Sequence, residues 1–215
     1  MYDLFDTTPP ETEQVALRTD AVVLRAFARD VEMELLTELR AVIALAPFRN
    51  MVTPGGYTMS VAMTNCGAAG WVTDAGGYRY TSYDPASAKP WPPMPATFLN
   101  LATRAAATAG FEGFVPDACL INRYAPGSKL SLHQDKNEAD YAAPIVSVSL
   151  GLPAKFLFGG LKRNDPVTRI ALRHGDVVVW GRAMRLAYHG VDTLKNGDHP
   201  LTGRFRFNLT FRKAL

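Results

Sequence analysis

The feature that most constrains the fold is a series of short apolar runs that fills the second half of the chain. Each run is rich in β-branched and aromatic residues and is bounded by glycine, proline or aspartate, which is typical of strands. No helical pattern intervenes, so an antiparallel sandwich or jelly roll is favoured over a βαβ fold. The runs are ACLINRYA, PIVSVSLG, AKFLFGG, VTRIALR, DVVVW, RLAYHG and RFRFNLTFR.

The first half of the chain carries two helical patterns. Apolar residues at helical spacing predict one amphipathic helix in DVEMELLTELRAVIALAP, with Asp30 as its N-cap and Pro47 at its end. A second helix is predicted in ATFLNLATRAAATAGF, where Gly110 is the stop signal. The Gly-, Pro- and Tyr-rich segment between them predicts short hairpins and loops rather than a packed element.

Composition narrows the class of protein. With 215 residues, 47% of them hydrophobic and 20% charged, the chain is expected to form one globular domain, residues 1–215. The net charge of +3 permits a polyanionic partner without requiring one. Cys66 and Cys119 match no zinc spacing and are expected to be free thiols. Because the sequence has neither an apolar run of membrane-spanning length nor a secretory leader, we expect a cytoplasmic protein without membrane contact, and nothing requires more than a monomer.

Two of the four histidines open a His-x-Asp pattern. In HGD, residues 174–176, the Gly-Asp pair indicates a turn, and we interpret this match as structural; His199 is expected in an exposed loop. In KLSLHQDKNE, His133 and Asp135 would share one face of a strand, and His189 is the remaining candidate partner. Two imidazoles and one carboxylate form the facial triad of non-haem Fe(II). The same residues also fit an ordinary salt link.

The last run, RFRFNLTFR, alternates polar and apolar residues and has two interpretations. One is a buried Phe/Leu face with a solvated polar face. The other turns the polar face into a cavity, where Arg206 and Arg212 could hold a dicarboxylate at its two ends. In LINRYAP, Asn122 and Tyr124 offer neutral donors for such a pocket, or ordinary cross-strand packing.

Taken together, these segments resemble the AlkB family of Fe(II)- and 2-oxoglutarate-dependent nucleic-acid dealkylases. The likeness rests on LINRYAPGSKLSLHQDKNE, PIVSVSLGLPAKFLFGG, HGDVVVW, YHGV and RFRFNLTFR, and it extends through FRNMVTPGGYTMSVAMTNCG. The resemblance implies an α+β fold: a double-stranded β-helix (jelly-roll, cupin-like) core with N-terminal helices and a nucleotide-recognition lid over residues 48–95.

The resemblance also implies a role for each candidate residue. His133, Asp135 and His189 would bind iron. Arg206 and Tyr124 would hold the distal carboxylate of 2-oxoglutarate, and Arg212, Asn122 and Asn208 its metal-chelating end. The substrate residues would be Met63, Trp71 and Tyr78 as walls for a flipped-out base, Thr53, Tyr57 and Lys129 at phosphates, Ser131, Gln134 and Lys136 on a rim facing the phosphate backbone, and Arg163 at the pocket.

One position departs from the family pattern. Similar members carry an aspartate where this chain has Asn137. An amide still accepts a hydrogen bond but offers no negative charge to a cationic base, so base preference and rate are affected rather than the type of reaction.

The activity implied is oxidative demethylation, a direct-reversal repair of bases such as 1-methyladenine and 3-methylcytosine. It would use Fe(II), 2-oxoglutarate and O2 and release formaldehyde, succinate and CO2. The partner would be alkylated single- or double-stranded DNA, with RNA as a second candidate. Three alternatives stay open: a small-molecule hydroxylase on the same iron scaffold, a zinc hydrolase, and a nucleic-acid-binding module without iron.

Overall fold

Two antiparallel sheets and a separate hairpin dominate the computed structural model, which describes residues 13–215. The predicted jelly-roll core is present, and none of the helices in the described part of the chain is long and apolar enough to cross a membrane. The helices are α1 (Glu32–Leu45) and α2 (Ala96–Thr108), with short 3-10 turns at Arg29–Val31 and Arg182–Met184. The strands are β1 (Gln14–Arg18), β2 (Ala21–Leu24), β3 (Arg49–Val52), β4 (Thr58–Gly67), β5 (Gly70–Asp74), β6 (Gly77–Thr81), β7 (Ala118–Tyr124), β8 (Leu130–His133), β9 (Ile145–Gly151), β10 (Ala154–Phe158), β11 (Thr168–Leu172), β12 (Val177–Trp180), β13 (His189–Val191) and β14 (Arg206–Arg212).

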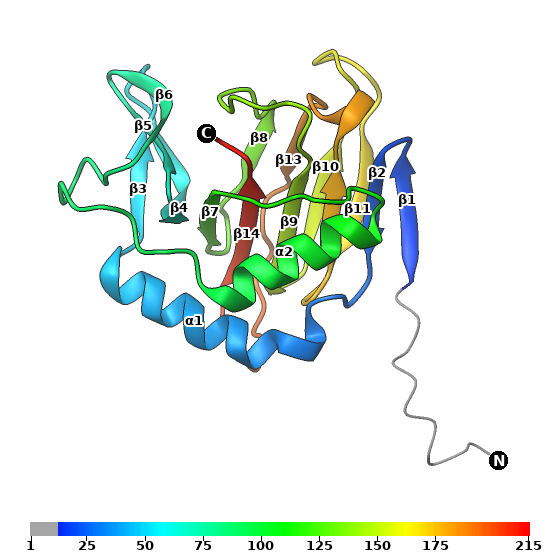
Figure 1. Ribbon diagram of the computed structural model, residues 1–215, viewed down its shortest axis with the longest axis horizontal. Helices are drawn as coiled ribbons and strands as arrows, with labels where there is room; N and C mark the ends of the chain where they lie inside the picture. The colour runs from blue at the N-terminus through cyan, green and yellow to red at the C-terminus, as the bar shows by residue number, and fades with distance from the viewer. Residues whose placement is uncertain (1–12) are drawn as a thin grey trace.

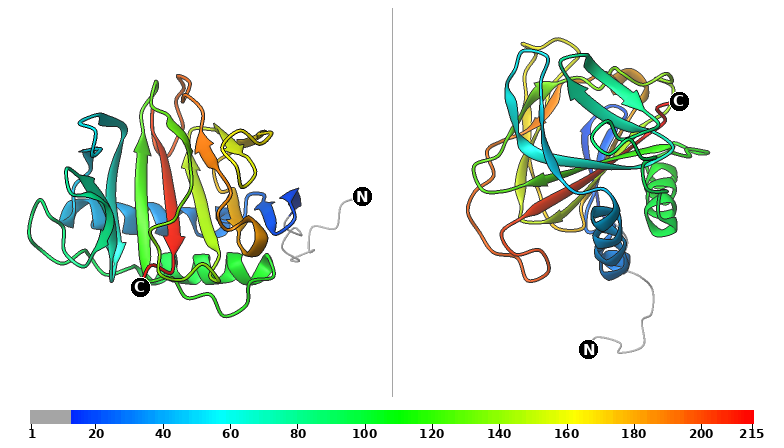
Figure 2. Two further views of the ribbon diagram at one scale, coloured as in Figure 1. Left: turned by 90° about the horizontal axis from the view of Figure 1, so that it is seen from above. Right: turned by 90° about the vertical axis from the view of Figure 1, so that its left-hand side faces the viewer.

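The two sheets face each other across a common interior. The large sheet has the order β1-β2-β12-β9-β14-β7-β4-β3, and the small sheet has the order β11-β10-β13-β8. The hairpin β5–β6 stands at the β3–β4 end of the molecule (Figure 1), and the view from that end shows the sheets curving around a common interior (Figure 2). The last strand, β14, lies in the middle of the large sheet between β7 and β9.

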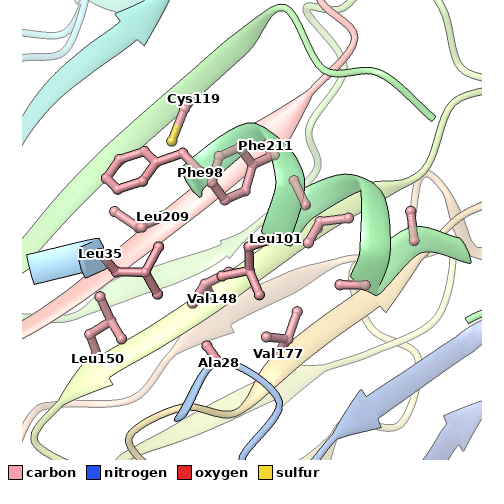
Figure 3. Close-up of a cluster of buried hydrophobic side chains, with 14 of the residues drawn as sticks. Ala28, Leu35, Phe98, Leu101, Cys119, Val148, Leu150, Val177, Leu209 and Phe211 are labelled. Carbon is pink, nitrogen blue, oxygen red and sulfur yellow. The ribbon is translucent and has the colours of Figure 1, made fainter. Parts of the chain in front are cut away.

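Both helices cover the outer face of the large sheet (Figures 1 and 2). Figure 3 shows Leu35 of α1 and Phe98 of α2 within one buried cluster with Val148, Leu209 and Phe211 of the sheet. Burying a side chain of this size stabilises the fold by about 1.5–3 kcal/mol. A second apolar cluster fills part of the space between the two sheets. The outer face of β14 packs against the helices, so the alternate side chains of this strand point toward the space between the two sheets.

The predicted helices are confirmed, but the start of the first differs. Asp30 is not an N-cap: it lies in the 3-10 turn before α1, where its carboxylate pairs with Arg104 of α2 at 2.8 Å. Residue Val31 occupies the cap position without a side-chain hydrogen bond. Gly110 ends the second helix as predicted, with φ of +81°, a conformation that glycine adopts at little cost.

The hairpins predicted between the helices are present as β3–β4 and β5–β6, but the expectation that this segment contains no packed element was wrong. The ten-residue strand β4 lies in the large sheet between the edge strand β3 and β7, and it pairs with β7 from Ala62 to Gly67. Its residues 61–66 are all buried, so no alternating pattern marked it in the sequence. Its polar residues are satisfied locally: the Thr64 hydroxyl donates to Ala46 O at 2.7 Å, and the Asn65 side chain pairs with the backbone of Trp71.

Candidate metal centre and active-site cavity

Three of the predicted residues converge at the small sheet. His133 and His189 are directly opposite each other in the β8–β13 pair, with ring centroids 4.4 Å apart. Each Nδ1 hydrogen bonds to a backbone carbonyl, of Ser131 at 2.9 Å and of Ala187 at 3.0 Å. The Nε2 atoms lie 3.6 and 3.7 Å from the Asp135 carboxylate. All three ligand atoms lie within 4.8 Å of one another, the only such cluster of three found in residues 13–215.

The close approach of the two histidines depends on Gly190. A β-carbon at this position would lie 2.6 Å from the backbone oxygen of Leu130 on β8. Any larger residue next to His189 would therefore push β13 away from β8 and separate the two rings.

Asp135 reaches the cluster from outside the strand. Strand β8 ends at His133, so the side-by-side geometry predicted from strand alternation is achieved by the segment that follows it. Arg212 fixes the carboxylate: its Nε and Nη2 donate to Asp135 Oδ2 at 2.8 and 2.6 Å. Oδ1 is left without a bond to Arg212 and faces His133, whereas His189 faces Oδ2.

The charge states of the cluster suit a divalent metal. Burial alone would raise the pKa of Asp135, but the charges of Arg212 and of the histidines hold that pKa well below its usual range. Burial and the neighbouring His133 lower the pKa of His189 to about 4, although Asp135 opposes them. At neutral pH Asp135 is therefore ionised and His189 neutral, the forms that bind metal. Two imidazole nitrogens and one carboxylate oxygen fit Fe(II) with open coordination positions.

The other His-x-Asp pattern is structural, as predicted. His174 Nδ1 accepts a hydrogen bond from the Gly151 N–H at 2.8 Å, and Nε2 lies 3.0 Å from a Glu32 oxygen. The expectation that His199 is exposed was wrong. It is half-buried because its ring stacks on that of His174, with centroids 4.5 Å apart.

The polar face of β14 is buried, so the interpretation as a solvated face was wrong. Its apolar residues Leu209 and Phe211 belong to the cluster beneath the helices, which turns the alternate residues toward the space between the sheets. Arg206, Asn208, Thr210 and Arg212 are each at most 6% exposed.

Arg206 is a buried cation without a counter-ion. Its side chain makes one hydrogen bond, from Nη2 to Ser149 Oγ at 3.0 Å, and Nε and Nη1 have no partner. The hydroxyl of Tyr124, directly opposite on β7, also lacks a partner. Burial lowers the pKa of Arg206 and raises that of Tyr124. A buried guanidinium of this kind calls for an anion, and a carboxylate such as that of 2-oxoglutarate matches its paired donors.

The two asparagines beside Arg206 form a short chain. Asn208 Nδ2 donates to Ser147 Oγ at 2.8 Å and to Val148 O at 3.0 Å, and its Oδ1 accepts from Thr210 and, at 3.4 Å, from Asn122 Nδ2. The Asn122 oxygen has no partner. Asn208 therefore holds Asn122, which offers the free polar atom.

All predicted site residues line one cavity of about 790 Å³ between the two sheets. This size accommodates a small co-substrate together with a base. The predicted residues on its wall are Thr53, Tyr57, Met63, Trp71, Tyr78, Asn122, Tyr124, Lys129, Ser131, His133, Gln134, Asp135, Lys136, Asn137, Arg163, His189, Arg206, Asn208 and Arg212.

The mouth of the cavity carries an aromatic pair. Trp71 of β5 and Tyr78 of β6 are stacked, with centroids 5.7 Å apart and planes inclined by 22°. The Trp71 indole N–H donates to Asn137 Oδ1 at 3.2 Å, which fixes the amide at the rim. Gln134, also predicted for the rim, donates to Leu186 O at 2.7 Å and so anchors the segment that leads to His189.

Sequence reasoning missed several residues around the centre. Trp180 ends an apolar run, and its ring lies 4.9 Å from that of His189. Tyr80 and Arg185 both contact buried Glu138, yet nothing in their local sequence marks them. Only Glu138 carried a signal in the sequence, because it is a charged residue three positions after the predicted ligand Asp135.

Comparison with known proteins agrees with this geometry. The family model described as the 2OG-Fe(II) oxygenase superfamily matches residues 20–212. Fold and site thus define a 2-oxoglutarate- and Fe(II)-dependent oxygenase, with O2 as the second co-substrate.

The relatives narrow this class. The protein is 61% identical to the alpha-ketoglutarate-dependent dioxygenase AlkB of Escherichia coli, over 100% of this chain and 98% of that protein. It is 36% identical to the nucleic acid dioxygenase ALKBH1 of Mus musculus, over 56% of this chain and 31% of that protein. The solved structure of OsALKBH1 superimposes with a TM-score of 0.81 at 27% identity, covering 94% of this chain and 100% of that one. The chain belongs to the AlkB family of dioxygenases.

Proposed function

We propose that the protein removes N-methyl groups oxidatively from alkylated bases in nucleic acid, with 1-methyladenine and 3-methylcytosine in DNA as substrates and RNA as a second target. The observation that carries the proposal is that the stacked Trp71–Tyr78 pair and the metal triad line the same cavity. A base extruded from a helix loses stacking, and an aromatic surface restores about 1–3 kcal/mol of it. Alkylation at a ring nitrogen makes the base cationic, which an aromatic face also favours.

Different residues of the cavity would bind the iron and the two ends of 2-oxoglutarate. His133, Asp135 and His189 would hold the iron. The unpartnered donors of Arg206 and Tyr124 support a role in holding the distal carboxylate of 2-oxoglutarate. Arg212 contacts Asp135 and would serve the chelating end together with Asn122 and Asn208, with Asn208 acting through Asn122.

The iron and its co-substrates would carry out the oxidation, and the protein would position the methyl group for it. When bound, Fe(II) with 2-oxoglutarate and O2 oxidises the N-methyl group, and the products are the repaired base, formaldehyde, succinate and CO2. The contribution of Trp71, Tyr78 and Met63 would be to present the methyl group to the triad. The segment 48–95 that carries them is proposed to act as a lid over the nucleotide.

The side chains at the rim of the cavity favour a nucleic-acid substrate over a small molecule. Lys129, Lys136 and Arg163 are exposed cations around the opening, and Thr53 and Tyr57 add hydroxyl donors. Cations and hydroxyl groups bind phosphates whatever the base sequence. A hydroxylase of small molecules would have no need of this rim, and a zinc hydrolase would leave Arg206 without a partner.

The test is mass spectrometry of a short oligonucleotide carrying one 3-methylcytosine, incubated with protein, Fe(II), 2-oxoglutarate and air. We expect loss of the methyl group with formation of succinate, and no conversion by a His189→Ala variant. A His199→Ala variant is the matched control, because His199 lies outside the cavity, and it should remain active. Succinate without demethylation would keep the iron chemistry and reject the nucleic-acid substrate; neither product from iron-loaded protein would reject catalysis.

A monomeric state and a cytoplasmic location are part of the proposal. Light scattering coupled to size exclusion would test the first, and cell fractionation the second.

A further inference from the structure

Two buried ionisable side chains behind the metal centre do not line the cavity. Glu138 and Arg185 form an ion pair, from Nη2 to Oε2 at 3.2 Å, and each side chain is 2% exposed. Burying such a pair is costly unless its remaining polar atoms are also bonded. The partners of these two residues therefore indicate what the pair is for.

On one side, Glu138 contacts the β5–β6 hairpin. The Tyr80 hydroxyl of β6 donates to Glu138 Oε1 at 2.7 Å. Burial raises the pKa of Tyr80 well above its usual value, so the phenol remains a donor at all physiological pH values. Tyr78, two residues earlier on the same strand, stacks on Trp71 at the cavity mouth.

On the other side, the pair contacts the metal ligand. Arg185 Nη1 donates to the backbone oxygen of Asp135 at 3.0 Å, while Arg212 donates twice to its carboxylate. Arg212 Nε also lies 3.4 Å from Glu138 Oε1, the oxygen that Tyr80 contacts. Both arginines that hold Asp135 therefore share Glu138 as a counter-ion.

We propose that Tyr80 and Glu138 are positioning residues that connect the β5–β6 hairpin to the metal ligand Asp135, so that metal binding and the seating of a base strengthen each other. With the phenol in place, Glu138 is satisfied and Arg212 stays on Asp135. Without it, Glu138 attracts the Arg212 Nε, and the carboxylate loses its fixed orientation. The positioning of the metal ligand stands on the contacts alone, whereas the link to the base rests on the proposed function.

The first test uses Co(II), which reports metal affinity without turnover. A Tyr80→Phe variant removes one hydroxyl and keeps the packing, and we expect it to bind Co(II) about 3- to 10-fold more weakly in a spectroscopic titration. Changing groups that bond to a metal ligand directly typically costs about 10–100-fold, and Tyr80 is one contact further away. The matched control is Tyr83→Phe. Tyr83 is 56% exposed and lies just after the same strand, so the Co(II) affinity of this variant should equal that of the unmodified protein. An unchanged Co(II) affinity in Tyr80→Phe would overturn the positioning role.

The second test measures the link to the base. An oligonucleotide with one 3-methylcytosine should raise the Co(II) affinity of the unmodified protein, and Co(II) should raise the oligonucleotide affinity by the same factor, since the coupling is reciprocal. In Tyr80→Phe this factor should fall towards one. An oligonucleotide that binds without changing the Co(II) affinity would overturn the coupling alone. Failure of any methylated oligonucleotide to bind would overturn the proposed function and the coupling with it, while the first test still decides the role of Tyr80.

Discussion

Replacing Arg206 with methionine should weaken 2-oxoglutarate binding without destabilising the unliganded protein. Arg206 is 1% exposed, and its guanidinium makes a single hydrogen bond to Ser149 and has no anion beside it. Removing an uncompensated buried charge relieves a desolvation cost. Methionine keeps most of the alkyl stem, and with it the packing near the ring of Tyr124, which lies 5.0 Å from the guanidinium carbon.

The magnitudes follow from the contacts that a carboxylate would make there. Two unpaired guanidinium donors would form charge-assisted hydrogen bonds worth about 1.5–3 kcal/mol each. Their loss corresponds to about 3–6 kcal/mol, or about 100- to 20,000-fold in Kd. The free energy of unfolding of Arg206→Met without ligand should increase, or decrease by less than about 1 kcal/mol. Arg185→Met is the contrasting variant: it removes the partner of Glu138 Oε2, leaves Tyr80 and Arg212 on the other oxygen, and should cost about 3–5 kcal/mol of stability.

Two assays separate these effects. Urea unfolding of metal-free protein gives the stability change, and calorimetric titration of 2-oxoglutarate in the presence of Mn(II) gives the affinity. Destabilisation by more than about 2 kcal/mol with an unchanged Kd would show that Arg206 is a structural residue, and the assignment would be refuted.

Three further changes test other parts of the site. The pKa of His189 is about 4 when folded, against about 6.5 for an ordinary histidine, so the unfolded chain takes up the proton first. The free energy of unfolding of metal-free protein should therefore fall by up to about 3 kcal/mol as the pH drops from 6.5 to 4, and urea unfolding of His189→Gln should lack that fall. Trp71→Ala should weaken binding of a methylated oligonucleotide by about 1–3 kcal/mol in fluorescence anisotropy while Co(II) affinity without oligonucleotide stays unchanged; equal anisotropy would exclude stacking. Asn137→Asp places a charge beside a cationic base and should raise kcat/KM for 3-methylcytosine about 3- to 10-fold but not for neutral 1-methylguanine; a parallel rise for both would contradict the electrostatic argument.

Alternation along a strand made part of the site predictable from sequence. In β14 the polar residues repeat every second position, so once one face packs against helices the other must face inward, and Arg206 and Arg212 share that face. The pairing of His133 with His189 followed from the shortage of other histidines and from the family resemblance, because cross-strand register cannot be read from a single sequence.

Other features left no local trace. Strand β4 is buried on both faces and contains Thr64 and Asn65, so neither alternation nor a pure apolar run revealed it. Arg185 lies in an ordinary-looking segment, and its importance comes from Glu138, which reaches it only in the folded chain. Asp30 has the residue type of a cap, but it lies within the 3-10 turn that precedes α1, and its carboxylate pairs with Arg104.

The pairing of β8 with β13 determines when the three metal ligands can come together during synthesis of the chain. Because His189 stands opposite His133 and far from it in sequence, no partial chain that ends before β13 can hold the metal with three ligands. Arg206 and Arg212 come later still, on the last strand. During synthesis, the cavity walls contributed by β4 to β10 leave the ribosome before the oxidising centre can assemble. Coordination of the metal by all three residues therefore becomes possible only after the strands from β4 to β10 have been synthesised.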